Sequence, residues 1–361
     1  MKMLLKKCVA VVILTYSVIV LCNYYVDTAN IFHTDILVDI AEKLHGGQIV
    51  ENPGNIDEGL FQKTMIQSMT HTPETVVVGS SHIMYEPWKF DDYYVAGLSG
   101  AYLGDYYATI GLLEEANHMP QHIVIGVDPW AFMSAANAGR HVSINDFARR
   151  EIERVSGSEA SKYIGIYNDG KSTLKKIKEL LSISYFQASV SGIKSNGIKH
   201  YLHRQVVCVD NSELGKKSKI MPNGRRIFAK GDIHTVQEND NDVAATLRKG
   251  SIYQLGKGFS ELQISNLQEF ESFICYLQAK GVKVEFYLHP WYPDVYDYFK
   301  NNVQFSGVIK TENYLRKMAN QHGIIVHGSY DPELTHSNKE DFADWFHLKA
   351  NKMLDSYNII L

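Results

Sequence analysis

The stretch TVVVGSSHIMYE, residues 75–86, constrains the fold more than any other part of the sequence. Its run of valines is β-branched and lacks polar alternation, which predicts a short strand buried on both faces. Gly79 then permits backbone geometry that other residues avoid, so we expect a tight turn after the strand. The polar residues Ser80, Ser81 and His82 follow this turn. Because ligands bind at the carboxyl ends of strands in open α/β sheets, the sequence predicts a site here.

Further segments have the composition of buried strands, and helical patterns separate most of them. The predicted strands are residues 93–97, 122–127, 282–288 and 324–326. Apolar residues spaced by three and four predict a helix over 103–113. A second apolar stripe, which begins at a capping-box pattern and ends at a glycine, predicts a helix over 260–281. Strands separated by helices predict an α/β fold with a parallel sheet and right-handed crossovers.

The N-terminal residues differ from the rest of the chain. Three lysines precede an uncharged, mainly apolar run over residues 8–26, and Asp27 follows it. As a helix this run would span roughly 28 Å, close to the ~30 Å hydrocarbon core of a bilayer. The flanking charges predict a single-pass anchor in the cell membrane, with a cytoplasmic N-terminus and an extracytoplasmic C-terminal domain. A cleaved signal peptide is the alternative, but Asp27 lies two positions before Ala29, which fits an A-x-A-like cleavage site badly.

These patterns divide the chain into three regions. We assign residues 1–26 to the cytoplasmic start and transmembrane anchor, 27–74 to a juxtamembrane segment, and 75–361 to the α/β domain. The alternation of strands and helices is lost between about 131 and 258, which predicts a mainly helical insertion that could act as a lid over the site.

Two features of the predicted insertion stand out. Residues 172–185 have the pattern of an amphipathic helix, and residues 199–230 are locally basic. A basic cluster can bind an anionic glycan or lipid headgroups. The alternative is a solvent-exposed surface without a binding partner. The chain as a whole has a net charge of −4, so nothing global indicates nucleic-acid binding.

The cysteines match no metal-binding spacing. Cys8 and Cys22 lie in the predicted anchor, which leaves Cys208 and Cys275 as the pair outside it. An oxidising compartment would permit a disulfide between these two, and two isolated thiols are the alternative.

A serine nucleophile needs a general base and a group that orients the base. Near the C-terminus the sequence reads Asp344-Trp345-Phe346-His347, an Asp-x-x-His spacing. The early Gly-x-Ser and this late Asp-x-x-His, in that order, resemble the SGNH (GDSL-type) hydrolase superfamily. The resemblance implies a three-layer α/β/α, flavodoxin-like domain. It also implies that Ser81 is the nucleophile, that His347 is the general base, and that Asp344 orients the imidazole.

The resemblance also assigns groups that would bind an oxyanion. The backbone N–H groups of Ser81 and Gly100 match two donors of the superfamily. Where the superfamily has an Asn as a further donor, this chain has Asp128, and an ionised carboxylate cannot donate. If this carboxylate lay about 4 Å from an oxyanion, the repulsion between the two charges would cost on the order of 4 kcal/mol at an effective dielectric near 20. We therefore expect Asp128 to turn away and to accept hydrogen bonds from nearby backbone N–H groups.

Other polar residues at the predicted strand ends are candidates for substrate contact. They are His82, Asp128 and His289. His82 directly follows Ser81, and because neighbouring side chains diverge, we do not expect it to be the base. A packed core or surface histidine is the alternative for His289.

Within the superfamily, an N-terminal anchor before an extracytoplasmic domain is similar to two groups. These are the D-alanyl transfer proteins of teichoic acid modification and the periplasmic O-acetyltransferases of exopolysaccharides. The resemblance implies a serine esterase or O-acyl(acetyl)transferase that acts on cell-surface polysaccharide or another acylated glycan. It implies no metal or organic cofactor, and it allows a membrane-bound O-acyltransferase as a partner.

Two alternatives remain open at this point. Asp128, and Ser80 at the position where the superfamily usually has Asp, favour a catalytically degenerate scaffold protein of a polysaccharide modification or assembly complex. A glycan-binding module is the weaker alternative, based on Trp88, Trp130, Trp291 and Trp345.

Overall fold

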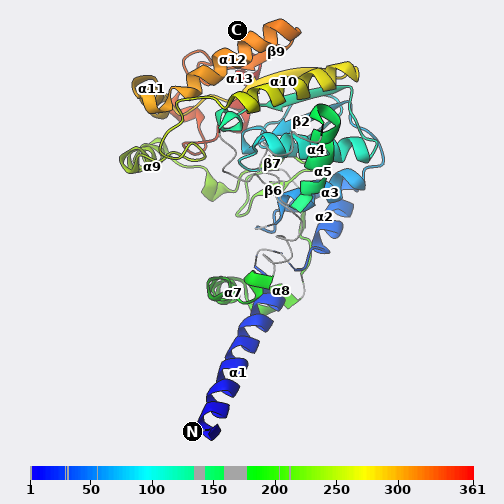
Figure 1. The fold of residues 1–361 in the computed structure, drawn as a ribbon, viewed down its shortest axis with the longest axis vertical. Helices are drawn as coiled ribbons and strands as arrows, with labels where there is room; N and C mark the ends of the chain where they lie inside the picture. The colour runs from blue at the N-terminus through cyan, green and yellow to red at the C-terminus, as the bar shows by residue number, and fades with distance from the viewer. Residues whose placement is uncertain are drawn as a thin grey trace.

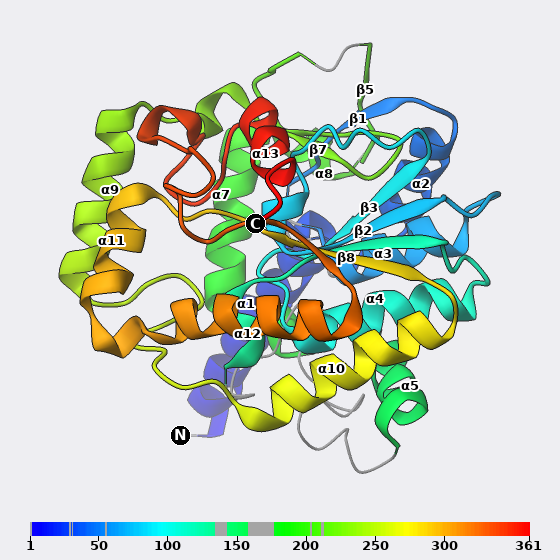
Figure 2. The ribbon, with the colours of Figure 1, turned by 90° about the horizontal axis from the view of Figure 1, so that it is seen from above.

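The computed structural model describes residues 2–28, 30, 32–54, 56–133, 143–157, 177–202, 204–210 and 213–361. Within them, five strands form a parallel sheet in the order β3-β2-β4-β8-β9 (Figures 1 and 2). The strands are β2 (Thr75–Gly79), β3 (Tyr93–Gly97), β4 (His122–Gly126), β8 (Lys283–Leu288) and β9 (Ile325–Gly328). Each overlaps a segment predicted from buried, β-branched composition, so the prediction of a parallel α/β sheet is confirmed.

Helices cover both sides of this sheet. Figure 2 shows α4 (Leu103–Glu115), α10 (Ile264–Ala279) and α12 (Gly307–His322) on one side and α13 (Ala350–Tyr357) on the other. The remaining helices of the α/β part are α5 (Asn145–Ser156), α9 (Val236–Lys249) and α11 (Pro293–Asn301). The helices α4 and α10 overlap the two apolar stripes, because helical spacing of apolar residues directs one face onto the sheet.

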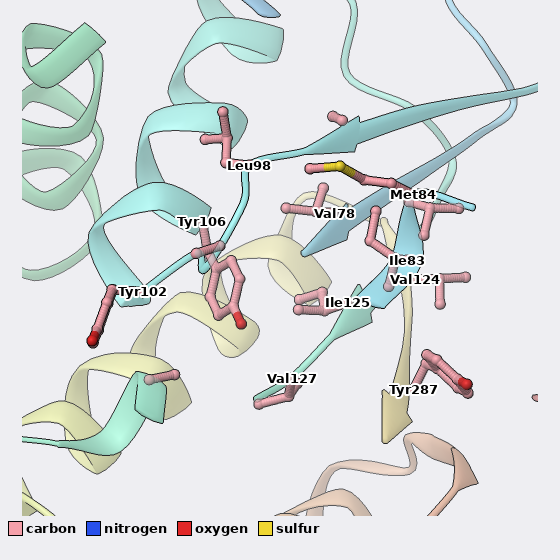
Figure 3. Packing of buried hydrophobic residues seen from close by; sticks show 14 of the residues in the cluster. Val78, Ile83, Met84, Leu98, Tyr102, Tyr106, Val124, Ile125, Val127 and Tyr287 are labelled. Carbon is pink, nitrogen blue, oxygen red and sulfur yellow. The ribbon is translucent and has the colours of Figure 1, made fainter. Parts of the chain in front are cut away.

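The carboxyl ends of β2, β3 and β4 pack tightly under the short helical turn η1 (Ser81–Ile83). Figure 3 shows Ile83 and Met84 over the strand ends. A Cβ on Gly126 would lie 2.3 Å from the Ile83 side chain, and one on Gly97 would lie 2.5 Å from that of Met84. Larger residues would displace η1, so the glycines that end these strands fix the place of Ser81.

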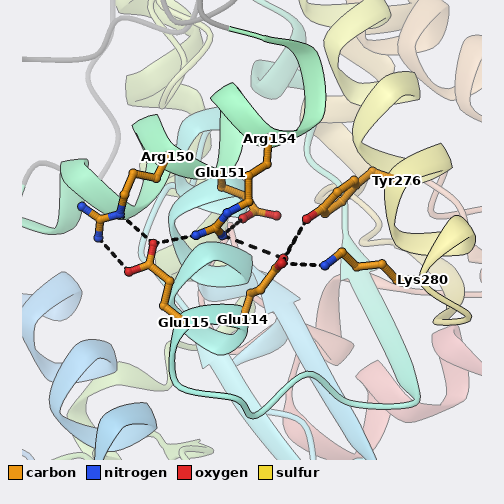
Figure 4. Close-up of polar contacts among 7 residues, drawn as sticks. All are labelled: Glu114, Glu115, Arg150, Glu151, Arg154, Tyr276 and Lys280. Carbon is orange, nitrogen blue, oxygen red and sulfur yellow. Dashed lines mark hydrogen bonds and ion pairs between the residues drawn. The ribbon is translucent and has the colours of Figure 1, made fainter.

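Ion pairs join α4, α5 and α10 on the side of the sheet that α4, α10 and α12 cover (Figure 4). Glu115 of α4 accepts hydrogen bonds from Arg154 of α5 at 3.0 Å and Arg150 at 2.7 Å. Glu114 accepts from Lys280, directly after α10, at 2.5 Å. Burial, together with the charge of Glu114, raises the pKa of Glu151 above its ordinary value. Through this network α5, from the predicted insertion, belongs to the packed body of the protein.

A second, antiparallel sheet has the order β5-β1-β6-β7. Strand β1 (Ile49–Glu51) comes from the predicted juxtamembrane segment, whereas β5 (Cys208–Val209), β6 (Lys219–Ile220) and β7 (Arg226–Ile227) come from the predicted insertion. Sequence analysis missed this sheet, because strands of two or three residues leave no alternation to detect. Cys208, in β5, and Cys275 are both free and exposed.

The segment before β2 also contacts the parallel sheet. It contains α2 (Ile36–His45) and α3 (Glu58–Gln67), which pack against each other and contribute buried side chains to the core. The amide of Gln62 donates a hydrogen bond to the carbonyl of Gly97 at the end of β3, at 3.1 Å. Helix α3 therefore lies beside the strand ends where the site was predicted.

Residues 172–176 of the predicted amphipathic helix lie outside the described residues. Residues 177–180 are helical, and a new helix, α7 (Ile183–Asn196), begins after a break. The Ser182 hydroxyl accepts a hydrogen bond from the Tyr185 amide at 3.1 Å and so caps α7. This cap divides what the pattern predicts as one helix.

The N-terminal helix α1 (Lys2–Val26) projects from the body of the protein (Figure 1). Its most apolar window has a mean hydropathy of 2.2 and is 6% buried. By length and composition alone it fits a membrane anchor or a signal sequence. Its carboxyl end packs against α7 and α8 (Ile198–Leu202).

Candidate active site

Ser81, His347 and Asp344 lie in a hydrogen-bonded row. The Ser81 hydroxyl contacts Nε2 of His347 at 2.8 Å, although the two residues are 266 positions apart in the sequence. On the other side of the ring, Nδ1 lies 2.9 Å from one carboxylate oxygen of Asp344 and 3.1 Å from the other. A hydroxyl, an imidazole and a carboxylate in this order form the arrangement that activates a serine for acyl transfer.

The Asp-x-x-His segment folds into a tight turn that orients its own side chains. One carboxylate oxygen of Asp344 accepts from the amides of Phe346 at 2.7 Å and His347 at 2.8 Å. The turn is closed by a hydrogen bond from the Ala343 amide to the His347 carbonyl at 2.8 Å. The three-residue spacing therefore brings the Asp344 carboxylate to Nδ1 of His347 within the same turn.

The environment of Asp344 favours its ionised form. Burial by itself would raise the pKa of this carboxyl, but the His347 ring and the hydrogen bonds it accepts lower the pKa below its ordinary value. An ionised Asp344 accepts a hydrogen bond from Nδ1–H of His347, which leaves Nε2 unprotonated toward Ser81. This is the tautomer that a general base requires.

The amides predicted to bind an oxyanion donate no hydrogen bond to the described residues. These are the backbone N–H groups of Ser81, at the start of η1, and Gly100, in the loop after β3. Gly100 has a positive φ of 63°. Only glycine adopts this conformation without strain, which accounts for its place in the loop.

A side-chain amide lies beside Gly100. A Cβ on Gly100 would meet Nε2 of Gln254 at 2.1 Å, so a larger residue there would push this amide out of its place. The Tyr102 hydroxyl donates to Oε1 of Gln254 at 2.7 Å, which leaves the NH₂ as the end that faces Gly100. Gln254 itself has a positive φ of 61°. Sequence reasoning missed this residue because it lies in an irregular loop with no motif.

A second histidine–carboxylate pair lies behind the first. Nδ1 of His82 is 2.6 Å from Asp128, and its Nε2 is 3.0 Å from the carbonyl oxygen of Phe346. Asp128 therefore bonds to a ring, and not to backbone N–H groups as we expected. A carbonyl oxygen can only accept, so Nε2 of His82 carries a proton, and a second proton lies between Nδ1 and Asp128.

His289 stacks on His82, with ring centroids 4.0 Å apart and an angle of 6° between the planes. Its Nε2 accepts a hydrogen bond from the Leu348 amide at 3.3 Å. Burial, and then the neighbouring His82 and His347 rings, lower the pKa of His289 well below its usual 6.5. The ring is therefore neutral, with its proton on Nδ1.

The three candidates for substrate contact, His82, Asp128 and His289, are all buried. Their hydrogen bonds run to one another and to the turn that carries His347, which supports a positioning role. Substrate contact by these side chains stays a prediction. The tryptophans Trp88, Trp130 and Trp291 are also buried, so they present no ring face to a glycan.

An aromatic pair flanks the exposed side of His347. Tyr85 and Phe228 stack with centroids 3.7 Å apart, and their rings lie 5.6 Å and 6.2 Å from that of His347. Nearby, Glu58 of α3 pairs with Arg226 at 2.9 Å and accepts from the Ser99 amide at 2.7 Å. The rim of the site thus combines α3, the segments that follow β2 and β3, the segment around β7 and the turn that carries His347.

Comparison with known proteins gives no family assignment. No family model matches this chain, and a search of curated proteins found no match. What is established is an α/β protein with a five-stranded parallel sheet, and its function must be argued from the site.

Proposed function

We propose that this chain is a membrane-anchored serine acyl-ester hydrolase or O-acyltransferase of the SGNH type. One observation carries the proposal: the Ser81 hydroxyl lies 2.8 Å from Nε2 of His347, whose Nδ1 is held by Asp344. A row of this kind is rare without a catalytic use, because each group must be oriented by its own local structure.

The strand order supports the fold part of the proposal. Numbering the strands of the parallel sheet by their place in the chain turns β3-β2-β4-β8-β9 into 2-1-3-4-5, the order of flavodoxin-like sheets. Ligands bind in such sheets where the strand order reverses, next to the first strand. Ser81 follows β2, the first strand of this sheet, and Asp128 follows the neighbouring β4.

The proposed reaction has two half-reactions. His347 takes the proton of Ser81 as the serine oxygen attacks the ester carbonyl, and the oxyanion accepts from the amides of Ser81 and Gly100 and from Gln254. His347 then gives the proton to the leaving alkoxide, and an acyl-enzyme remains. Next, water or a sugar hydroxyl gives its proton to His347 and attacks the acyl group. His347 then returns this proton to the Ser81 oxygen as its bond to the acyl group breaks, which restores both residues. Water yields a free acid, and a sugar yields a new ester.

In the proposed site, Gln254 replaces the side-chain oxyanion donor that Asp128 cannot provide. The superfamily that the motifs resemble uses an Asn side chain as an oxyanion donor, and here Asp128 bonds to His82 instead. In our proposal the Gln254 amide supplies the missing side-chain donor from a different segment. In the proposal, the Asp128 carboxylate faces His82 and not the oxyanion, and the proton that it shares with His82 compensates its charge.

We propose cell-surface polysaccharide, or another acylated glycan, as the substrate, and acetyl as the acyl group. The support is the exposed apolar helix α1 with lysines in its first turns, which fits an extracytoplasmic domain, and the resemblance to polysaccharide O-acetyltransferases and D-alanyl transfer proteins. A membrane-bound O-acyltransferase as donor of the acyl group is part of the same proposal.

Fluorophosphonate labelling of the full-length protein in detergent micelles tests the enzyme. We expect a label on Ser81, and loss of the label in Ser81→Ala and His347→Ala. Ser260→Ala is the control, because Ser260 is exposed and lies outside the site, so the change should leave labelling intact. A label that is absent from the wild type, or that persists in both site variants, would refute the proposal.

The second candidate is a non-enzymatic scaffold of a polysaccharide-modifying complex, which Asp128 at the expected Asn position favours. It predicts that Ser81→Ala leaves polymer acylation in cells unchanged, whereas removal of α1 abolishes it. The enzyme predicts that both changes abolish acylation.

A further inference from the structure

An exposed apolar surface surrounds the carboxyl end of α1. Its members are between 42% and 58% exposed, and they come from the end of α1 and from residues 177–202: Tyr24, Tyr25, Ile177, Leu181, Ile183, Ile198 and Leu202. We call this set the α7–α8 surface. Clustered apolar side chains on a water-facing surface are unfavourable, so such a set indicates a contact.

The α7–α8 surface lies level with the end of the apolar run. The side-chain amide of Asn23 lies within 3.1 Å of the carbonyl oxygens of Glu179 and Leu180. Asn23 is three residues before the end of α1, or about 4.5 Å along the helix axis. If α1 spans a bilayer, this is the depth of the headgroup region, where Tyr24 and Tyr25 would belong to the aromatic belt.

The orientation of α7 fits a bilayer surface. Figures 1 and 2 together show α7 running across the end of α1, with the body of the protein beyond it. A helix perpendicular to a membrane-spanning helix lies in the plane of the membrane. Amphipathic helices bind there by inserting their apolar side chains between the lipids.

Polar groups of this region point inward. Asp27 is fully buried and accepts hydrogen bonds from the Phe32 amide at 2.9 Å and the Tyr185 hydroxyl at 2.8 Å. Arg204 lies 3.8 Å from the same carboxylate and donates to the carbonyl of Val26 at 2.8 Å. The charge of Asp27 is thus paired inside the region, while the apolar side chains of the α7–α8 surface lie outside.

The exposed charges of the segment are mainly positive. Lys178, Lys194 and Lys199 are exposed, and Glu179 is the only acidic residue in the sequence 177–202. Lysines that flank an apolar surface pair with anionic headgroups, so charge and hydrophobicity indicate the same occupant.

We propose that residues 177–202 form a second membrane contact, with the apolar side chains of the α7–α8 surface in the headgroup region and its lysines on anionic phosphates. The proposal rests on α1 as a retained anchor and is independent of the reaction at Ser81. Two contacts, one spanning and one lying flat, would hold the domain in one orientation on the membrane.

Lipid quenching of a fluorophore tests this contact in the full-length protein. The free cysteines, Cys8, Cys22, Cys208 and Cys275, are replaced by serine. Single cysteines are then introduced by Ile183→Cys or Leu202→Cys and labelled with a small environment-sensitive dye. The protein is placed in nanodiscs of phosphatidylethanolamine and phosphatidylglycerol that contain nitroxide lipids. Ile264→Cys is the matched control, because Ile264 is an exposed isoleucine on α10.

We expect quenching at positions 183 and 202 to be several times that at 264, and weaker in discs of phosphatidylcholine alone. Equal quenching at all three positions would refute the contact, and equal quenching in both lipids would refute the role of the lysines. The dyes could instead be protected from aqueous iodide but not quenched by the lipids, in particles of doubled protein mass. That result would assign the surface to contact with a second copy of this chain. An intact mass of membrane-extracted protein that lacks α1 would remove the basis of the proposal. None of these readouts depends on catalysis.

Discussion

Two histidine–carboxylate pairs lie side by side, with the rings of His82 and His347 5.6 Å apart, and they differ in their surroundings. The side chains of His347 and Asp344 are 18% and 26% exposed, whereas those of His82 and Asp128 are 4% and 3% exposed. The Nε2 nitrogen of His347 faces the Ser81 hydroxyl, which can give up a proton. The corresponding nitrogen of His82 faces a carbonyl that can only accept one. In the proposed reaction, the partner of Nε2 is therefore what distinguishes His347, the base, from His82, which holds the turn.

The two pairs are also connected. The Phe346 carbonyl accepts from His82, and the amide of the same residue donates to Asp344. The buried pair thus holds the turn that carries the exposed pair. The comparison predicts that changes in one pair affect chemistry first, and changes in the other affect folding first.

The largest effect is expected from His347→Ala. Loss of the base should slow fluorophosphonate labelling of Ser81 by about a thousandfold. Because the ring is partly exposed, the free energy of unfolding should change little. Labelling kinetics and urea unfolding, measured on the same sample, separate the two effects. A normal labelling rate would show that the exposed pair is not the base.

Asp128→Ala should act in the opposite way. It leaves the buried His82 ring without its partner, and breaking a buried pair typically costs about 3–5 kcal/mol of folding free energy. Urea unfolding followed by fluorescence of the buried tryptophans measures the loss. Asp344→Ala is the matched control and should lose less stability. If the two variants were equally stable, the contrast between the pairs would fail.

Gln254→Ala tests the donor beside Gly100. Removing one oxyanion donor should reduce the rate of ester hydrolysis by about a hundredfold to a thousandfold, with no loss of stability. Gln263→Ala, at the N-cap of α10, is the control and should keep the wild-type rate. An unchanged rate in Gln254→Ala, in a protein that Ser81→Ala inactivates, would exclude Gln254 from the oxyanion hole.

The smallest effect concerns pH. His289 has a lowered pKa in the folded protein, so the unfolded chain binds its proton first as the pH falls below about 6.5. Stability should then decrease toward lower pH, with a slope of at most about 1.4 kcal/mol per pH unit from this group. His289→Gln should remove this part of the slope in urea unfolding measured between pH 5 and pH 7. The same slope in the variant would mean that His289 is not neutral in the folded state.

The sequence predicted the parts of the protein that local patterns encode. The valines before Gly79 are buried in β2 because a β-branched run without polar residues suits a central strand, and Ser81 follows it at the rim. The divergence of neighbouring side chains also separates Ser81, at the surface, from His82, in the interior. These features depend on residues that are close together in the chain.

The parts that sequence analysis missed depend on distant segments. Gln254 reaches Gly100 through a loop without a motif, and Asp128 reaches His82 because β2 and β4 end side by side in the sheet. The antiparallel sheet joins strands too short to show alternation. In each case the decisive contact is made by tertiary packing, which a single sequence does not display.

The position of β1 has a practical consequence for anyone who cuts this chain. A soluble version that starts at Thr75, the natural choice from the strand pattern, would strip β5 and β6 of the neighbour they share. It would also remove Glu58 from Ser99 and Gln62 from Gly97, next to Gly100. An expression fragment should therefore begin ahead of Ile36, since residues 36–74 pack against the parallel sheet and contribute to its core.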